Sequence, residues 1–301
     1  MISSLDSGSL AFLNGINQIH RRSERAQTQL TTGLRINSIS DDPSQIPALL
    51  ATQAELGRTQ QISSNLNNVK AEVDTAEISV QSAVSLVERA QTLGTQGQSA
   101  FVSADSRTQI AGELGGILQQ LVGVANTTVG GRFIFSGDSD QTAAYTLDLT
   151  QANPISAFGG TASTRQVEHP DGSVFSVSKT AQDLFDSSNP QQNVFQTINN
   201  LRTALLNNDQ AGIDQGIPAL KGIGTYVNQQ LSFYGVAQNR VADGLDFGST
   251  LATQLQTRLS GIRDADLTQA ITEFTQANTQ QQAALSARAK IPRSSLFDYL
   301  G

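Results

Sequence analysis

The chain has no cysteine and no tryptophan, and only 5% of its 301 residues are aromatic. Without cysteine it can form neither disulfide bonds nor cysteine-ligated metal sites, which suits a secreted protein that is never cross-linked. The low aromatic content argues against a large globular core. With only two histidines, a Ser-His-Asp site would have to use His20 or His169, and both are expected to be solvated surface residues. These absences favour a protein that is not an enzyme.

The charge balance and the hydropathy pattern exclude two further classes. The net charge is -7, the pI is near 4.8 and only four lysines occur, which argues against a nucleic-acid partner. No segment approaches the roughly 18 consecutive apolar residues that cross a bilayer, so membrane insertion is not expected. Residues 1–17 lack the basic start, apolar block and cleavage site of a signal peptide. We therefore expect a chain that is cytoplasmic or exported without a cleaved leader.

Motifs for cofactors and metals are incomplete. Asp138 and Asp140 could open a calcium loop, but the positions that require glycine and glutamate hold Ala143 and Leu149. No GxxxxGK sequence is present to cradle a phosphate. We expect no cofactor, no metal and no catalytic site.

What the sequence does contain is a stripe of apolar or small residues in alternating steps of four and three. An average of 3.5 residues per turn keeps such a stripe on one side of a helix, as in a seam between packed helices. There are two such stripes. At about 1.5 Å per residue, the one that runs from Leu220 to Ile262 predicts a helix near 65 Å long. The first stripe comprises Ile62, Leu66, Val69, Val73, Ala76, Val80, Ala83, Val87 and Ala90, and the second Leu220, Gly224, Val227, Leu231, Tyr234, Gln238, Val241, Leu245, Gly248, Ala252, Leu255, Leu259 and Ile262.

Both ends of the chain carry weaker stripes with polar members. Residues 5–30 predict a helix that Gly33 ends, with Ser9 and Ser23 where a stable coiled coil would have leucine. Residues 267–285 repeat the spacing with Asn278 and Gln281 near the centre. Such helices bury too little apolar surface to order alone, so we expect both ends to fold when they pack on something else.

Residues 32–42, between the stripe of residues 5–30 and the stripe that starts at Ile62, form a connector rich in turn-forming residues. Asp42 could cap a helix that begins at Pro43, or the helix could begin at Pro47 after one irregular turn. Gly94 and Gly97 are expected to end this helix after Leu93.

The middle of the chain changes character at Gly130. A helix over 110–124 precedes it, and short aromatic or β-branched runs at 133–135, 145–149, 167 and 174–177 predict strands. His169 to Gly172 predict a tight turn. A further helix is expected from Asn189 and Pro190, followed by a loop around 208–216.

Several stretches resemble the flagellin superfamily of bacterial flagella. The connector, QLTTGLRINSISDDP at 29–43, is similar to the family's conserved pattern after the first helix. ANTTVGGRFIFSG at 125–137, NVFQTINNLRTAL at 193–205 and YGVAQNR at 234–240 resemble the members that join hook to filament. The receptor-recognised segment of filament subunits is mostly lost at 87–96, which favours the junction role over the filament.

The resemblance implies a mainly α, elongated antiparallel helical rod formed by both chain ends, with a small inserted β-rich domain. Residues 1–42 with 265–301 would be coiled-coil assembly segments, 43–135 with 189–264 the rod, and 136–188 the outer domain. The implied partners are further copies in a ring or tube, a hook-associated protein and filament flagellin as neighbours, and an export chaperone, all at an extracellular flagellum. The expected assembly interface comprises Leu5, Phe12, Ile16, Ile19, Leu30, Leu34, Arg35, Ile36, Asn37, Leu267, Ile271, Phe274, Leu285, Leu296, Phe297 and Leu300.

Two other interpretations remain open from the sequence. A filament flagellin would share the fold and would polymerise alone, whereas a junction subunit would not. A coiled-coil adaptor or effector is the alternative from another class, and the paired polar seams and the RINSISDDP connector argue against it.

Overall fold

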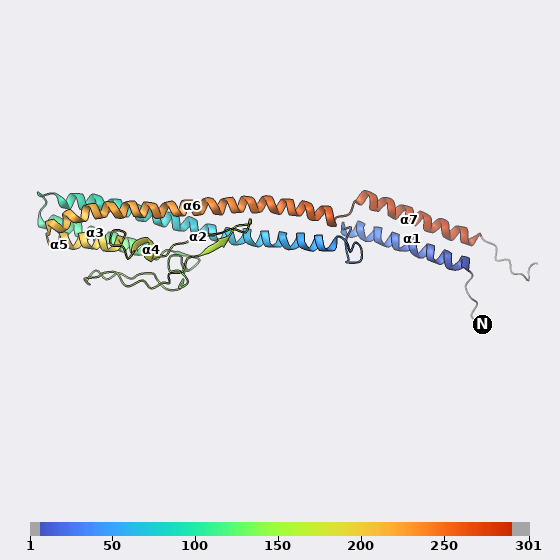
Figure 1. Ribbon diagram of the computed structural model, residues 1–301, viewed down its shortest axis with the longest axis horizontal. Coiled ribbons are helices and arrows are strands. Elements are labelled where there is room, and N and C mark those ends of the chain that lie inside the picture. Colours follow the sequence, from blue (N-terminus) through green and yellow to red (C-terminus); the bar gives the residue numbers. More distant parts are fainter. Residues whose placement is uncertain (1–6, 291–301) are drawn as a thin grey trace, which may run out of the picture. The chain divides into compact units, whose positions relative to one another are not determined.

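The computed structural model describes residues 7–290, which are mainly helical (Figure 1). It divides into one unit of residues 1–58 with 251–301 and a second unit of residues 59–250. The helices are α1 Ser7–Thr32, α2 Ile46–Gln98, α3 Ala104–Ala125, α4 Ala181–Phe185, α5 Val194–Leu206, α6 Gln210–Arg263 and α7 Leu267–Ala289. The strands are β1 Thr128–Val129, β2 Arg132–Phe133, β3 Gln166–Glu168 and β4 Val174–Ser176. The expectation of a mainly α protein with a small β component is confirmed.

In the first unit, α1 and α7 lie side by side and run antiparallel (Figure 1). Gly33 ends α1 as predicted, because its φ of 71° lies in the left-handed region and its N–H donates to the Gln29 carbonyl at 2.8 Å. Asp266 caps α7 by accepting from the N–H groups of Thr268 and Gln269. Local signals therefore define both helices.

The start of α2 differs from one of the two expectations. Asp42 does not cap this helix, which begins at Ile46, one residue before the alternative start at Pro47. The carboxylate of Asp42 instead accepts from Arg35 and from the Ser44 hydroxyl, so it stabilises the connector. The first turns of α2 then pack on the end of α6 in a small core of Ile36, Leu49, Leu56, Leu255 and Leu259.

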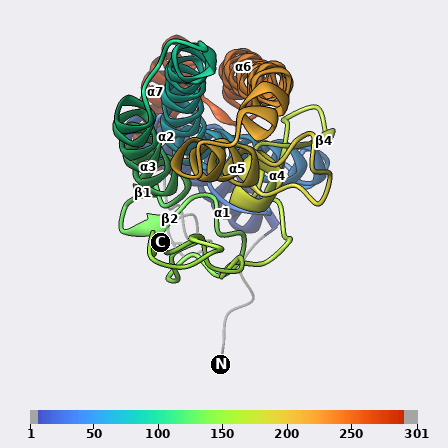
Figure 2. The same cartoon turned by 90° about the vertical axis from the view of Figure 1, so that its left-hand side faces the viewer.

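The second unit is a helical bundle around one core (Figure 2). Every member of the stripe from Ile62 to Ala90 is buried, which confirms that prediction. The members of the α6 stripe are all buried or half-buried. A four-three stripe thus correctly marks the buried side of both long helices.

The predicted end of α2 at Leu93 is wrong, because the helix continues to Gln98. Gly94 lies inside it, and a Cβ there would come within 2.9 to 3.1 Å of side-chain atoms of Ile217, Leu201 and Leu220. Gly97 faces Leu205 in the same way. These glycines permit close helix packing, which outweighs their tendency to end a helix.

Two helix starts also differ from prediction. α5 begins at Val194 and is capped by Asn193, because Asn189 and Pro190 belong to the preceding turn, where the Asn189 side chain accepts from the Gln191 N–H. The loop expected around 208–216 is helical from Gln210 onward. The reversal takes only residues 207–209, in which Asn208 has a φ of 50° that asparagine tolerates better than most residues.

The β component consists of two antiparallel pairs, β1 with β2 and β3 with β4. The predicted turn joins β3 to β4, where the Gly172 N–H donates to the His169 carbonyl at 2.8 Å. The run at 145–149 forms only a single bridge, between Leu147 and Ile155, and the backbone of Tyr145 instead bonds the side chain of Asn126 through both its N–H and its carbonyl. The short helix α4 was not predicted, although Thr180 and Asp183 form a capping box at its start.

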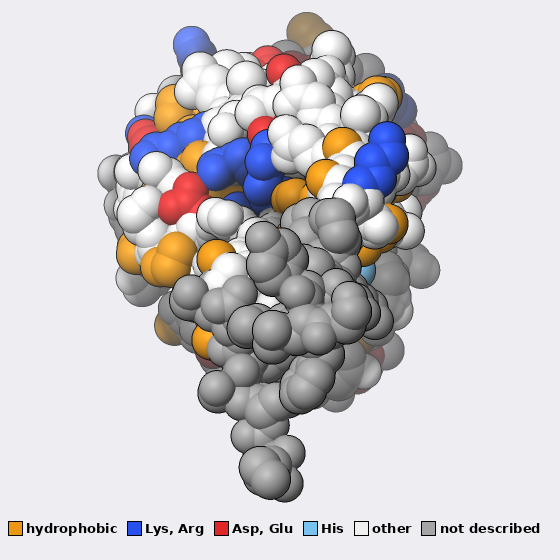
Figure 3. Space-filling model, turned by 90° about the vertical axis from the view of Figure 1, so that its right-hand side faces the viewer, with side chains coloured by type: hydrophobic (Ala, Val, Ile, Leu, Met, Phe, Trp, Pro, Cys, Tyr) orange, Lys and Arg blue, Asp and Glu red, His pale blue; other side chains and the backbone are white. Residues whose placement is uncertain are grey.

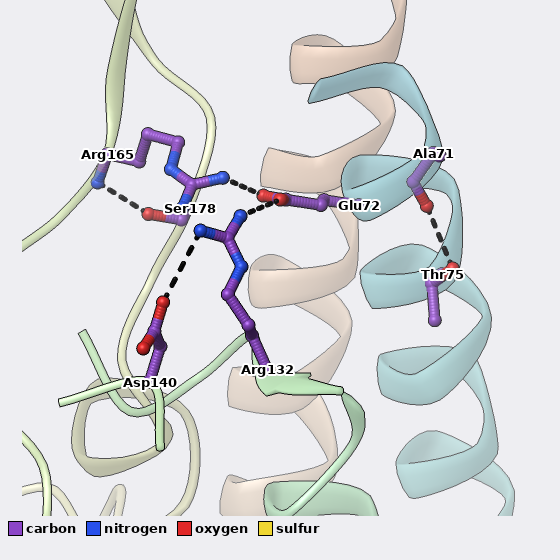
Figure 4. Close-up of polar contacts among 7 residues, drawn as sticks. All are labelled: Ala71, Glu72, Thr75, Arg132, Asp140, Arg165 and Ser178. Carbon is purple, nitrogen blue, oxygen red and sulfur yellow. Dashed lines mark hydrogen bonds and ion pairs between the residues drawn. The ribbon is translucent and has the colours of Figure 1, made fainter. Parts of the chain in front are cut away.

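Glu72 on α2 anchors the β-containing segment, residues 128–176, to the bundle (Figure 4). Its two carboxylate oxygens accept from Arg132, at 3.1 Å, and from Arg165. Arg132 also pairs with Asp140 at 3.5 Å, and the Arg165 N–H donates to the Ser178 hydroxyl. One carboxylate therefore holds residues that lie before β3 to a helix of the core.

Candidate assembly interface

The connector between α1 and α2 docks on the junction between α6 and α7 within the first unit. The N–H groups of Arg35 and Ile36 both donate to the Arg263 carbonyl, at 2.7 and 3.3 Å. The Ala265 N–H donates to the Gly33 carbonyl at 2.9 Å. These bonds tie the end of α1 to the start of α7 through backbone groups.

The side chain of Arg35 reinforces this docking. Its Nη1 donates to Asp42 Oδ2 at 2.8 Å, and its Nη2 donates to the Ile262 carbonyl at 2.5 Å. The Ser44 hydroxyl and the Arg35 guanidinium hold the pKa of Asp42 below its ordinary value. Arg35 therefore links the connector to the last turn of α6.

Asp41 stabilises the turn from inside the connector. Its Oδ2 accepts from the N–H groups of Asn37 and Ser38, at 2.9 and 2.7 Å. Burial tends to raise the pKa of Asp41, but these bonds and the charge of Arg25 lower it below its ordinary value. The Asn37 amide donates to the Leu34 carbonyl at 2.8 Å, so the RIN and DD elements of the motif all have local structural partners.

A polar seam joins α1 to α7. The Ser23 hydroxyl donates to Asn278 Oδ1 at 3.4 Å, and Arg288 donates to the Ser9 hydroxyl at 2.7 Å while its guanidinium lies 5.5 Å from the Phe12 ring centre. The fully buried apolar residues of this pair are small, namely Ala26, Ala270 and Ala277. Within the described residues, therefore, no large apolar side chain of α1 or α7 is fully buried.

Large apolar side chains of the same two helices remain uncovered. Five of them are 45 to 56% exposed: Leu10, Leu13, Leu267, Ile271 and Leu285. Figure 3 shows basic side chains gathered beside hydrophobic ones on one face of the molecule. Arg21, Arg22, Arg25, Arg288 and Lys290 are exposed on or beside α1 and α7. Apolar and basic side chains are therefore both exposed on α1 and α7.

A charged recess adjoins the connector. It has a volume of about 240 Å³ and is lined by Arg25, Gln29, Arg35, Asp41, Ala265, Asp266, Gln269 and Glu273. Both signs of charge occur in it, so it can pair with a polar surface that also carries both signs.

The structure places the predicted interface residues in three settings. Phe12, Ile16, Ile19, Leu30, Leu34, Arg35 and Phe274 are half-buried, Ile36 is buried in the first unit's own core, and Asn37, Leu267, Ile271 and Leu285 are exposed. Leu5, Leu296, Phe297 and Leu300 lie outside the described residues. The stripe analysis missed Leu10 and Leu13 because they lie off the four-three seam; as large apolar residues on an otherwise polar helix face, they could have been found.

The described residues offer little for chemistry. Within residues 7–290, no group of three or more His, Cys, Asp or Glu side chains is placed to hold a metal ion. No helix in that range is both long and apolar enough to span a membrane.

Comparison with known proteins identifies the family. The model of the bacterial flagellin N-terminal helical region matches residues 4–140, and that of the flagellin C-terminal helical region matches residues 218–300. These two regions together span most of the sequence. The chain therefore belongs to the bacterial flagellin family.

Individual relatives include both junction and filament proteins. Flagellar hook-associated protein 3 of Escherichia coli (strain K12) is 24% identical over 295 residues, covering 89% of this chain and 90% of the relative. That of Salmonella typhimurium is 25% identical over 303 residues and covers 92% of each chain. The flagellin of Bacillus subtilis is 23% identical over 297 residues, covering 93% of this chain and 94% of the relative.

Solved structures share the fold. A Vibrio parahaemolyticus protein described as a flagellar hook-associated protein matches with a TM-score of 0.64 at 21% identity, covering 74% of this chain and 100% of that one. The flagellar junction protein of Legionella pneumophila matches with a TM-score of 0.50 at 11% identity, covering 72% of this chain and 98% of that one.

Proposed function

We propose that this chain is a structural, non-enzymatic subunit of the junction between the hook and the filament of a bacterial flagellum. Residues 1–42 and 265–301 act as assembly segments, residues 43–135 with 189–264 form the rod, and residues 136–188 form the outer domain. The terminal segments order when the subunit assembles. Flagellar relatives named for the hook-associated role, matched over about nine-tenths of their length, support this proposal.

The observation that carries the proposal is the poor apolar packing of α1 on α7. Ordering a residue costs about 1 to 2 kcal/mol of backbone entropy, and small buried side chains with a polar seam offset little of it. The uncovered leucines and Ile271 provide the missing apolar surface once neighbouring subunits cover them. Leu10, Leu13, Leu267, Ile271 and Leu285 are the contacts that we assign to neighbours, whereas Leu34 to Asn37 shape the connector.

The partners follow from this role. Further copies complete a ring or tube, a hook-associated protein and filament flagellin lie on its two sides, and an export chaperone holds the chain before assembly. The chain works outside the cell as part of the flagellum, with no nucleic acid and no membrane insertion involved.

Deleting the gene and viewing the cells by electron microscopy tests the junction role. The proposal predicts hooks that carry no filament, with flagellin released into the medium. Complementation with the wild-type gene should restore filaments. Normal filaments on the hooks of the deletion strain would contradict the proposal.

The second candidate is the filament subunit itself, because flagellins match this chain at similar identity and coverage. Seeding distinguishes the two roles. The purified chain, added to filament fragments at high salt, should not elongate them if it is a junction subunit. Continuous elongation would favour the filament subunit.

A further inference from the structure

A recess of about 350 Å³ lies within the second unit. One wall is the segment 153–157, which is held in place because Asp148 donates its N–H to the Pro154 carbonyl at 2.7 Å. The other wall is α5, and Phe195 contributes to the lining. The Phe195 ring packs edge-on against the Tyr145 ring, with 5.1 Å between the ring centroids. Because this contact fixes Phe195, the recess is preformed.

Side-chain amides dominate the lining. Gln196, Asn199 and Asn200 occupy one face of α5 at helical spacing, and Asn153 lies on the opposite wall. Within residues 7–290 the side chains of Asn153, Gln196 and Asn200 make no hydrogen bond. Their donors and acceptors are available to a ligand.

Asn199 adds an independent observation. Its Nδ2 donates weakly to the Ala152 carbonyl at 3.4 Å, and its Oδ1 is buried without a partner among the described residues. A buried acceptor without a donor is destabilising, and rotation about the broad terminal torsion of asparagine can bring it to a ligand hydroxyl. A plain solvated helix face would leave this oxygen in water.

The charge of the lining favours a neutral ligand. No Lys, Arg or His side chain lines the recess, which argues against phosphate or sulfate. Asp186 is the one carboxylate, and it already accepts from Asn193 Nδ2 at 2.9 Å and from the Tyr145 hydroxyl at 3.2 Å. Its charge is therefore engaged within the protein.

We propose that the recess between residues 153–157 and α5 binds a neutral sugar. Each sugar hydroxyl both donates and accepts a hydrogen bond, as does each side-chain amide. The volume falls in the range of small-ligand pockets and is compact for an extended peptide. This inference goes beyond the proposed junction role and does not depend on it.

Ligand-observed NMR on the full chain tests the proposal with glucose and N-acetylglucosamine as neutral probes. Sulfate, spermidine and N-acetylalanine methylamide serve as anionic, cationic and peptide-like probes. The wild type should bind at least one sugar saturably and in preference to the other three probes. Absence of saturable sugar binding, or preferential binding of a charged or peptide-like probe, would overturn the proposal.

Two variants locate the site. Asn199→Ala should weaken sugar binding about 3- to 10-fold, the effect of one lost hydrogen bond. Asn200→Leu, at an exposed position that tolerates change, should abolish sugar binding. This second variant keeps the test decisive if Asn199→Ala fails to fold. Asn239→Ala, at an exposed position of α6 outside the recess, should bind as the wild type does. Equal binding by all folded variants would place the sugar elsewhere and contradict the proposal.

Discussion

Arg107 donates from Nη1 to Asn208 Oδ1 at 2.5 Å and so joins the start of α3 to the loop between α5 and α6. Arg107 is only 5% exposed, yet its hydrogen-bond partners among residues 7–290 are all uncharged. They are Asn208, Gln210 and the carbonyls of Gly97 and Ser99 at the end of α2. A cation is favoured there because the carbonyl end of a helix carries partial negative charge.

Replacing Arg107 should therefore destabilise the second unit. Arg107→Ala removes four hydrogen bonds of a buried side chain, including the one to the buried Gly97 carbonyl, and should lower the free energy of unfolding by about 3 kcal/mol. Urea unfolding followed by circular dichroism measures the change. Arg89→Ala is the matched control, because its pair with Glu113 is half-exposed and should contribute less than about 1 kcal/mol. An equal loss of unfolding free energy in the two variants would show that the hydrogen bonds of Arg107 stabilise the second unit no more than an exposed ion pair does.

The glycines of the bundle should respond in opposite directions. Gly94→Ala places a Cβ against the side chains of Leu201, Leu220 and Ile217, of which the two leucines are buried, and should lower the free energy of unfolding by about 1 kcal/mol or more, despite its better helix propensity. Gly112→Ala on α3 meets nothing within 4 Å and should raise it by about 0.5 to 1 kcal/mol. Thermal unfolding of both variants checks the signs. A stabilising Gly94→Ala would mean that α2 and α6 are less closely packed there.

The connector should weaken in acid. The folded-state pKa values of Asp41 and Asp42 lie below their ordinary value of 3.8, so their contribution is present above that pH and is lost as the pH falls through the folded values. Amide exchange at Asn37 and Ser38, which donate to Asp41, should accelerate below about pH 4 relative to amides of α5. Asp41→Asn should accelerate the same amides at neutral pH and reduce their acid dependence. If Asp41→Asn leaves the exchange of these amides and its pH dependence unchanged, Asp41 does not stabilise the connector.

The anchor at Glu72 should control access to the β-containing segment. Glu72→Gln weakens the contacts with Arg132 and Arg165, so trypsin should cut after these arginines faster while the bundle keeps its stability. Glu88→Gln, at an exposed position on the same helix, is the control and should digest like the wild type. Identical digestion of the Glu72 variant would show that other contacts hold the segment.

The sequence predicted helices well where one repeating rule controls burial. The stripe from Ile62 to Ala90 is buried throughout, because helix periodicity alone decides which side faces a neighbour. Gly94 misled the prediction because the same residue type serves helix ends and close packing, and only the position of Leu201 distinguishes the two. Local signals cannot decide such cases.

The polar network of the connector was less accessible to prediction. The RINSISDDP motif indicated a family, but the sequence does not reveal that Arg35 reaches the Ile262 carbonyl or that Asp41 serves Asn37 and Ser38. These partners depend on how distant segments fold together. The polar seam was predictable from Ser23 and Asn278, whereas their direct bond required the structure.

Hydrogen exchange on α1 and α7, read against α5, tests most directly whether the terminal helices order on assembly. In the free monomer, amides of residues 7–32 and 267–289 should exchange much faster than those of 194–206, and they should become protected in assembled flagellar junctions. Protection of both terminal helices in the monomer at the level of α5 would contradict the proposed ordering.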